Sequence, residues 1–218
     1  TILSELNITN FDTSQVTEMC NTFSGMSKLT SLDLTNFKTS NVVDMSSMFR
    51  GDSVLEIRGI EKFDTSKVTD MSYMFLDCSA MKSIDVSNFD ASSVETTEYM
   101  FEYCSSLTSL DLSQFNTPYC KNMAYMFGSC SSLKQINLKG LETKNVITMS
   151  NMFVDCKELV SLDLSNFDTS KVTAMDNLFA NCNRLTSLDI SKFTTNEVLI
   201  MNGMFSQCGY LTSIDVIS

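Results

Sequence analysis

Histidine and tryptophan are absent from this sequence of 218 residues, and proline occurs once. Histidine is the side chain that most often serves as a general base, so its absence removes the commonest route to acid–base catalysis. No C-x-x-C pair is present to bind zinc through thiolates instead. A nucleophilic cysteine would also need a base or cation beside it to lower its pKa. These absences argue against zinc sites and cysteine nucleophiles.

Glycine, long apolar runs and positive charge are also scarce. The seven glycines form no Gly-rich loop of the kind that binds phosphate groups. No apolar stretch approaches the roughly 18 residues that span a membrane, so we expect no membrane insertion. The chain has 15 Lys and Arg against 26 Asp and Glu, for a net charge of −11, which disfavours nucleic acid as a partner. Hydrophobic residues at 43% exclude a disordered tail.

What the sequence does contain is a repeat with a period of 26 residues. Phenylalanine recurs at this spacing without insertion in a first column, which consists of Phe23, Phe49, Phe75, Phe101, Phe127, Phe153, Phe179 and Phe205. A second column has Leu141 in one place and otherwise consists of Phe11, Phe37, Phe63, Phe89, Phe115, Phe167 and Phe193. Such self-similarity predicts a solenoid in which each coil buries the apolar face of its neighbour.

The first part of each repeat predicts a short strand. In the unit at residues 159–182, Leu159, Leu162 and Leu164 have the L-x-x-L-x-L spacing of a leucine-rich repeat. Leu162 and Leu164 alternate with polar residues, which indicates a strand with one buried face.

The second part of the unit predicts a short helix or a 3₁₀ turn. From Val172 onward, apolar residues recur about every three positions. Thr169 or Ser170 would be the N-cap. The predicted fold class is therefore an α/β repeat, a right-handed leucine-rich-repeat-like solenoid. It has one short parallel strand and one short helix or 3₁₀ turn per repeat, about eight repeats, and a single domain over residues 1–218.

Two repeats depart from the pattern. In the third, Asp52 replaces Cys, Arg58 replaces the inward Leu and Gly59 replaces Asp. The departures in the sixth repeat are Asn137 for Asp, Lys139 for Ser or Thr, and Leu141 for Phe. They indicate either neutral drift or a local binding site.

Six of the eight cysteines also fall in one column: Cys78, Cys104, Cys130, Cys156, Cys182 and Cys208. Disulfide frameworks show paired, irregular spacings, whereas one cysteine per repeat is typical of a small apolar residue in the core. We therefore expect free, buried thiols.

A column of carboxylates on the outward side of the strands is the candidate partner-binding face. It reads Asn7, Asp33, Gly59, Asp85, Asp111, Asn137, Asp163, Asp189 and Asp215, mostly flanked by Ser and Thr. The candidate site residues are Asp33, Asp85, Asp111, Asp163, Asp189, Asp215 and Lys139. Stacked like charges are unfavourable, and hydrogen bonds from the hydroxyl groups or bound Ca²⁺ would relieve them. The face is either a solvated surface or a binding surface for a basic partner. Its regular layout offers no unique carboxylate pair, so we expect no enzyme and no required cofactor.

Thr1 and Ser218 both lie within the repeat pattern, so we expect this sequence to be a piece of a longer chain. The terminal segments 3–8 and 211–216 are predicted to be open edge strands, which favour end-to-end self-association.

The unit L-x-x-L-D-L-S-N-F-D-T-S-x-V-x-x-M-x-x-M-F-x-x-C-x-x-L resembles the 26-residue repeats of bacterial surface proteins, which are related to BspA-like leucine-rich-repeat proteins. The resemblance covers essentially the whole chain. It implies a secreted protein at the cell surface, with adhesion to a protein or another ligand of the host or matrix surface. A passive spacer that displays other domains is the alternative, because the outward positions vary little between repeats.

Overall fold

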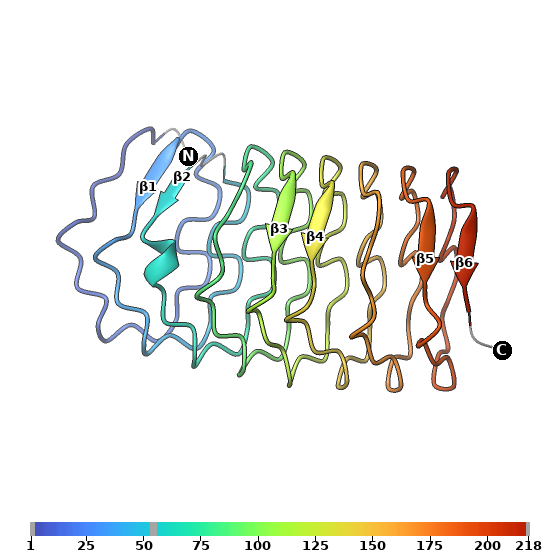
Figure 1. The fold of residues 1–218 in the computed structure, drawn as a ribbon. Helices are drawn as coiled ribbons and strands as arrows, with labels where there is room; N and C mark the ends of the chain where they lie inside the picture. The colour runs from blue at the N-terminus through green and yellow to red at the C-terminus, as the bar shows by residue number, and fades with distance from the viewer. Residues whose placement is uncertain (1–2, 53–55, 217–218) are drawn as a thin grey trace.

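The computed structural model describes residues 3–52 and 56–216, and within them the chain winds as similar coils stacked along one axis (Figure 1). In this described part, three two-stranded parallel sheets lie on one side. β1 (Ser31–Asp33) pairs with β2 (Glu56–Arg58), β3 (Ser109–Asp111) with β4 (Gln135–Asn137), and β5 (Ser187–Asp189) with β6 (Ser213–Asp215). The predicted solenoid with short parallel strands is confirmed.

β1, β3 and β5 each place one apolar side chain in the core between two exposed polar ones, whereas Ile57 in β2 and Ile136 in β4 are half-buried and all three residues of β6 are exposed. Leu32, Leu110 and Leu188 are buried in this way. The segments 83–85 and 161–163 have the same pattern of Ser, an apolar residue and Asp, but form no strand. The strand side of the coils is therefore a series of strand pairs and not one continuous sheet.

The continuous ladder lies in residues 18–25 and in the equivalent residues of each later coil, which we call the turn ladder. Parallel bridges join it from coil to coil, from Glu18 and Asp44 to Ala174 and Ile200. Alternate N–H groups donate to carbonyl groups of the next coil: Tyr99 N–H to Ala124 O at 2.9 Å is one example. The buried backbone thus finds its partners between coils.

The turn ladder corrects the prediction of a short helix or 3₁₀ turn in this segment. Among the described residues there is no α-helix, and the 3₁₀ turn η1 (Ile60–Lys62) follows β2 instead. The apolar period of three arises from successive turns, such as Met100 N–H to Thr97 O at 3.1 Å. Two residues per coil have positive φ, as Tyr99 (57°) and Tyr103 (59°) do, and these interrupt any helix.

The predicted N-cap threonine has a different role. The Thr169 hydroxyl donates to Thr194 O at 2.9 Å and accepts the Thr194 N–H at 2.8 Å. It therefore fastens one coil to the next. Threonines that donate in the same way are Thr13, Thr39, Thr65, Thr117 and Thr143.

Phenylalanine rings form the spine of the core. Consecutive rings of the first column stack, with centroids 5.3 Å apart for Phe75 and Phe101 and 6.1 Å apart for Phe101 and Phe127. Burial and stacking of these rings stabilise each coil only through its neighbours. The first and last described coils are less covered, and Phe11 and Leu199 are 61% and 84% exposed.

Candidate binding face

Five carboxylates of the predicted column share one position on the strand side of the coils; Asp33, Asp111 and Asp189 end strands, whereas Asp85 and Asp163 lie outside any strand. In each, one oxygen accepts the backbone N–H two residues later. The pairs are Asp33 with Thr35 (3.0 Å), Asp85 with Ser87 (3.0 Å), Asp111 with Ser113 (2.9 Å), Asp163 with Ser165 (3.1 Å) and Asp189 with Ser191 (2.9 Å). These contacts form Asx turns, which redirect the chain after the aspartate. The column therefore has a structural role in every one of these coils.

The same contacts hold the carboxylates in their charged form. A bond from the backbone N–H is the largest cause that lowers the pKa of Asp33 and Asp111, and one from the serine hydroxyl is the largest for Asp85, Asp163 and Asp189. Hydroxyl hydrogen bonds are thus one of the two predicted means of relieving the stacked charge. The side chains remain exposed to a partner.

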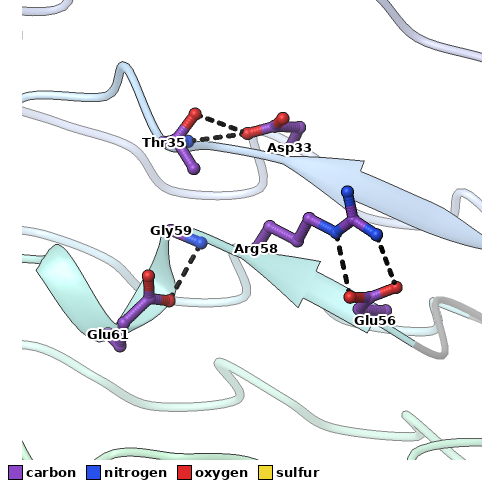
Figure 2. A network of polar contacts seen from close by, with 6 residues as sticks. All are labelled: Asp33, Thr35, Glu56, Arg58, Gly59 and Glu61. Atoms are coloured by element: carbon purple, nitrogen blue, oxygen red, sulfur yellow. Dashed lines mark hydrogen bonds and ion pairs between the residues drawn. The ribbon is translucent and has the colours of Figure 1, made fainter.

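The third coil corrects the predicted column (Figure 2). Asp33 pairs with Arg58 and Leu32 with Ile57, so the register is one residue shorter than 26. Ile57 takes the inward position, whereas Arg58 points outward and its Nε lies 2.9 Å from Glu56 Oε1. Gly59 therefore lies outside the column.

Gly59 allows the chain to turn immediately after β2. Its φ is 88°, and its N–H donates to Glu61 Oε2 at 2.9 Å (Figure 2). An added Cβ would lie 2.5 Å from Thr35 N, so no larger residue fits. The pairing of β1 with β2 is offset by 25 residues, and the following turn η1 accommodates the one remaining residue. The spacing of 26 residues to the preceding coil is therefore restored at Phe63.

The sixth coil carries the remaining departures. Asn137 pairs with Asp111 across β3 and β4, which line a hollow of about 370 Å³ on the strand side. Lys139 is exposed, and its charge contributes to lowering the pKa of Asp163. Asp215 is exposed and pairs with Asp189 across β5 and β6. The structure thus brings the candidate residues to one side of the molecule, but Asp33, Asp111, Asp189 and Asp215 lie in separate strand pairs and the others lie outside the strands.

Metal binding or thiol chemistry would require a suitable arrangement of the acidic and cysteine side chains. Within the described ranges, no group of three or more Cys, Asp or Glu side chains is arranged to hold a metal ion. Ca²⁺ on the Asp column therefore stays a prediction. The cysteines of the column are free, and each donates its S–H to a carbonyl of the preceding coil, as Cys104 does to Phe75 O at 3.2 Å. Burial raises the pKa of Cys130 to about 12, which keeps that thiol protonated.

A second outward column was missed by the sequence analysis. Tyr73, Tyr99 and Tyr125 lie at the same position of three consecutive turn ladders and stack on one another. Their spacing of 26 residues is visible in the sequence and could have identified them. Nothing in the sequence alone distinguishes this outward position from the buried apolar positions beside it.

Comparison with known proteins gives a family and solved structures of similar fold. The family model described as "Mycoplasma protein of unknown function, DUF285" matches residues 3–82, 22–138, 48–161 and 134–215. The crystal structure of a leucine-rich repeat protein from Bacteroides ovatus is similar, with 17% identity and a TM-score of 0.47. That alignment covers 91% of this chain and 58% of the other. No curated protein sequence matches. Within the described residues, no helix has the length and hydropathy of a membrane span.

Proposed function

We propose that this chain, which belongs to the DUF285 family, is a non-enzymatic scaffold at the cell surface that binds a protein or another ligand of the host or matrix surface. The observation that carries this proposal is the exposed column of ionised carboxylates at a fixed position of successive coils. Such a column presents the same charge repeatedly along one side. A basic partner would gain from several weak contacts at once.

The repeat architecture supports a scaffold over an enzyme. The core is shared evenly among coils, and the carboxylates of the Asp column are held in the same way in each. Catalysis requires one site with a unique arrangement of groups, which the Asp column does not provide. The match to a family of repeats that resembles bacterial surface proteins supports an extracellular or cell-surface location.

The proposal is tested by neutralising the column without changing its turns. We choose Asp85, Asp111, Asp163 and Asp189, each replaced by Asn. Asn7 and Asn137 already occupy this column, and their side-chain oxygens accept the N–H two residues later at 3.2 and 3.3 Å. The quadruple variant therefore keeps the Asx turns and loses four charges.

The measurement is binding of the intact chain and of the variant to immobilised matrix and host-surface proteins at low and physiological salt. We expect loss of binding in the variant, and a matched variant with four carboxylates outside the Asp column replaced should keep it. Glu56, Glu95, Glu142 and Glu158, each replaced by Gln, supply that control. If no ligand binds even the intact chain, the spacer function is favoured instead.

A further inference from the structure

The tyrosine column forms a closely stacked group on the outside of the turn ladders. The ring centroids of Tyr73 and Tyr99 are 4.9 Å apart, and those of Tyr99 and Tyr125 are 4.6 Å apart, with the rings nearly parallel. All three side chains are half-buried. At the Tyr73 end, the guanidinium of Arg50 lies over the ring, 5.9 Å from its centroid. One end of the stack therefore already holds a cation of this chain.

The backbone at these tyrosines is strained. Tyr73, Tyr99 and Tyr125 have φ of 60°, 57° and 57°, a region that bulky L-residues avoid. The same position in other coils is occupied by residues that tolerate this region or by serine: Asn21, Ser47, Asn151, Asn177 and Gly203. Three consecutive coils thus carry a bulky residue that is poorly suited to the local backbone. Strain of this kind is common where a side chain serves binding.

Beside the stack lies a hollow of about 620 Å³, lined by Tyr73, Tyr99, Tyr103, Leu76, Asp77, Glu102, Arg50 and Gly51. Tyr103 is 50% exposed at its rim, and Leu76 is buried. The hollow therefore combines aromatic rings, an apolar side chain and two carboxyl groups. Pockets of this composition bind ligands that are partly apolar and carry a charge.

Glu102 is the unusual member of this group. Its side chain is only 6% exposed, and among the described residues it has no hydrogen-bond partner. The equivalent positions in the adjacent coils are Leu76 and Gly128, and an added Cβ at Gly128 would lie 3.3 Å from Glu102 Cγ. Gly128 thus leaves room for the glutamate. Its carboxyl oxygens are not fully buried and line the hollow, where a ligand that supplies a donor or a positive charge can contact them.

The charges that face the stack are mostly negative. Burial is the largest cause that raises the pKa of Tyr99 and of Tyr73, and the charges of Glu98 and Glu102 raise both further. Asp70 also raises the pKa of Tyr73, whereas Arg50 lowers it. The pKa of Tyr125 is raised as well, mainly by burial and then by the charges of Glu102 and Asp176. A positively charged group that enters the hollow is attracted by these carboxylates and by the faces of the aromatic rings.

We infer that the hollow beside Tyr73, Tyr99 and Tyr103 receives a lysine or arginine side chain of a basic protein segment, with Glu102 and Asp77 facing the charge and Leu76 facing the methylene stem. This inference rests on the proposed scaffold function and names a second binding surface for it. Aromatic and apolar groups pack against the stem of such a side chain, while carboxylates bind its head. The surface lies on the turn ladders and not on the Asp column.

The test uses the intact 218-residue chain and fluorescein-labelled hexapeptides in which arginine or lysine alternates with glycine. The matched peptide contains citrulline in place of arginine, which keeps the shape and removes the charge. We expect fluorescence anisotropy to show saturable binding of the basic peptides at 1:1 stoichiometry, and at least about tenfold weaker binding of the citrulline peptide.

Protein variants locate the binding. Asp77→Asn and Glu102→Gln should each weaken binding at least about fivefold. Asp155→Asn removes the same charge at the same position of a coil three repeats away, where Asp155 contacts Lys157, and should change binding less than about twofold. Since Asp77 is exposed, its variant remains informative even if Glu102→Gln unfolds. Equal effects of Asp77→Asn and Asp155→Asn would overturn the site.

Two further outcomes separate this inference from the proposed function. Loss of peptide binding in the quadruple Asp-to-Asn variant alone would place the basic segment on the Asp column and reject the hollow, while the scaffold function would stand. Preferential binding of a neutral oligosaccharide such as cellohexaose, lost in Tyr99→Asn but retained in Glu102→Gln, would reject the cation and assign the hollow to sugars. Peptide binding at the hollow with no capture of any matrix protein would keep the inference and reject only the broader function.

Discussion

The hydroxyl of Thr143 donates to Asp168 O at 2.9 Å and accepts the Asp168 N–H at 2.7 Å, so one buried side chain satisfies both backbone groups of a residue in the next coil. This double contact recurs in most coils. Ala91 occupies the same column without a hydroxyl. The fold therefore tolerates the loss of one such contact, but each contact should contribute measurably.

We expect Thr143→Val to lower the free energy of unfolding by about 1–3 kcal/mol, because the substitution keeps the shape of the side chain and leaves the Asp168 N–H and carbonyl without their partner. Urea unfolding followed by circular dichroism measures the change. Thr186→Val, at an exposed site, should shift stability by less than about 0.5 kcal/mol. A loss in Thr143→Val no larger than this control would contradict the role.

Two buried carboxyl groups should make the protein less stable as pH rises towards neutrality. Burial raises the pKa of Asp52 from 3.8 to about 7 and that of Glu102 from 4.5 to about 7. The folded state then binds these protons more tightly than the unfolded chain, so the free energy of unfolding falls between about pH 4 and pH 7. Each group contributes on the order of 2–4 kcal/mol across that interval.

Substitution by the residue of a neighbouring coil should flatten this dependence. Asp52→Cys restores the residue of the cysteine column, and Glu102→Leu restores that of Leu76. Because the chain has no histidine, no other ordinary side chain titrates near pH 7. Thermal unfolding from pH 4.5 to 8 checks the slope, and an unchanged slope in both variants would contradict the assignment.

The tyrosine stack should contribute little to stability despite its close packing. Tyr99→Asn relieves a left-handed backbone that costs about 1–2 kcal/mol. It also removes two ring contacts, each worth about 0.5–1.5 kcal/mol. We expect a net change within about 1 kcal/mol in guanidinium unfolding. Tyr99→Val retains the strain and should destabilise the protein by at least about 2 kcal/mol more than Tyr99→Asn.

Exposed apolar residues of the last coils should promote self-association. Leu199 and Met201 are 84% and 51% exposed, and β6 has three exposed residues. We expect the 218-residue chain to form concentration-dependent dimers or longer assemblies in sedimentation velocity. Leu199→Lys with Met201→Lys should shift it towards the monomer. Association that persists unchanged in this double variant would rule out these residues.

The sequence was sufficient to predict the stacking of coils, because buried columns can be read directly from spacing. The Phe column predicted which rings meet, and Phe75, Phe101 and Phe127 do stack. The alternation around Leu162 predicted a strand that segment 161–163 does not form, although the equivalent segments around Leu110 and Leu188 are strands. Burial depends on side-chain type, which a sequence shows.

Backbone conformation was harder to predict from the same pattern. A period of three is common to a 3₁₀ helix and to successive turns, and positive φ at Tyr99 is not expected for tyrosine. The register shift at Arg58 was also missed, because the columns of residues before and after Gly59 keep their spacing of 26 residues and show no insertion or deletion. The hollow beside Glu102 depends on contacts between three coils and has no local signature in one repeat.

The hydrogen bonds of each coil are made to a fixed position of the next, as the Tyr99 N–H to Ala124 O contact shows. A gene segment encoding one whole unit can therefore be duplicated or lost, and every donor still finds an equivalent acceptor. Array length can change in evolution without redesign of the core. A cluster confined to three successive coils, such as the tyrosines, would then change its position along the solenoid when units are added or lost beside it.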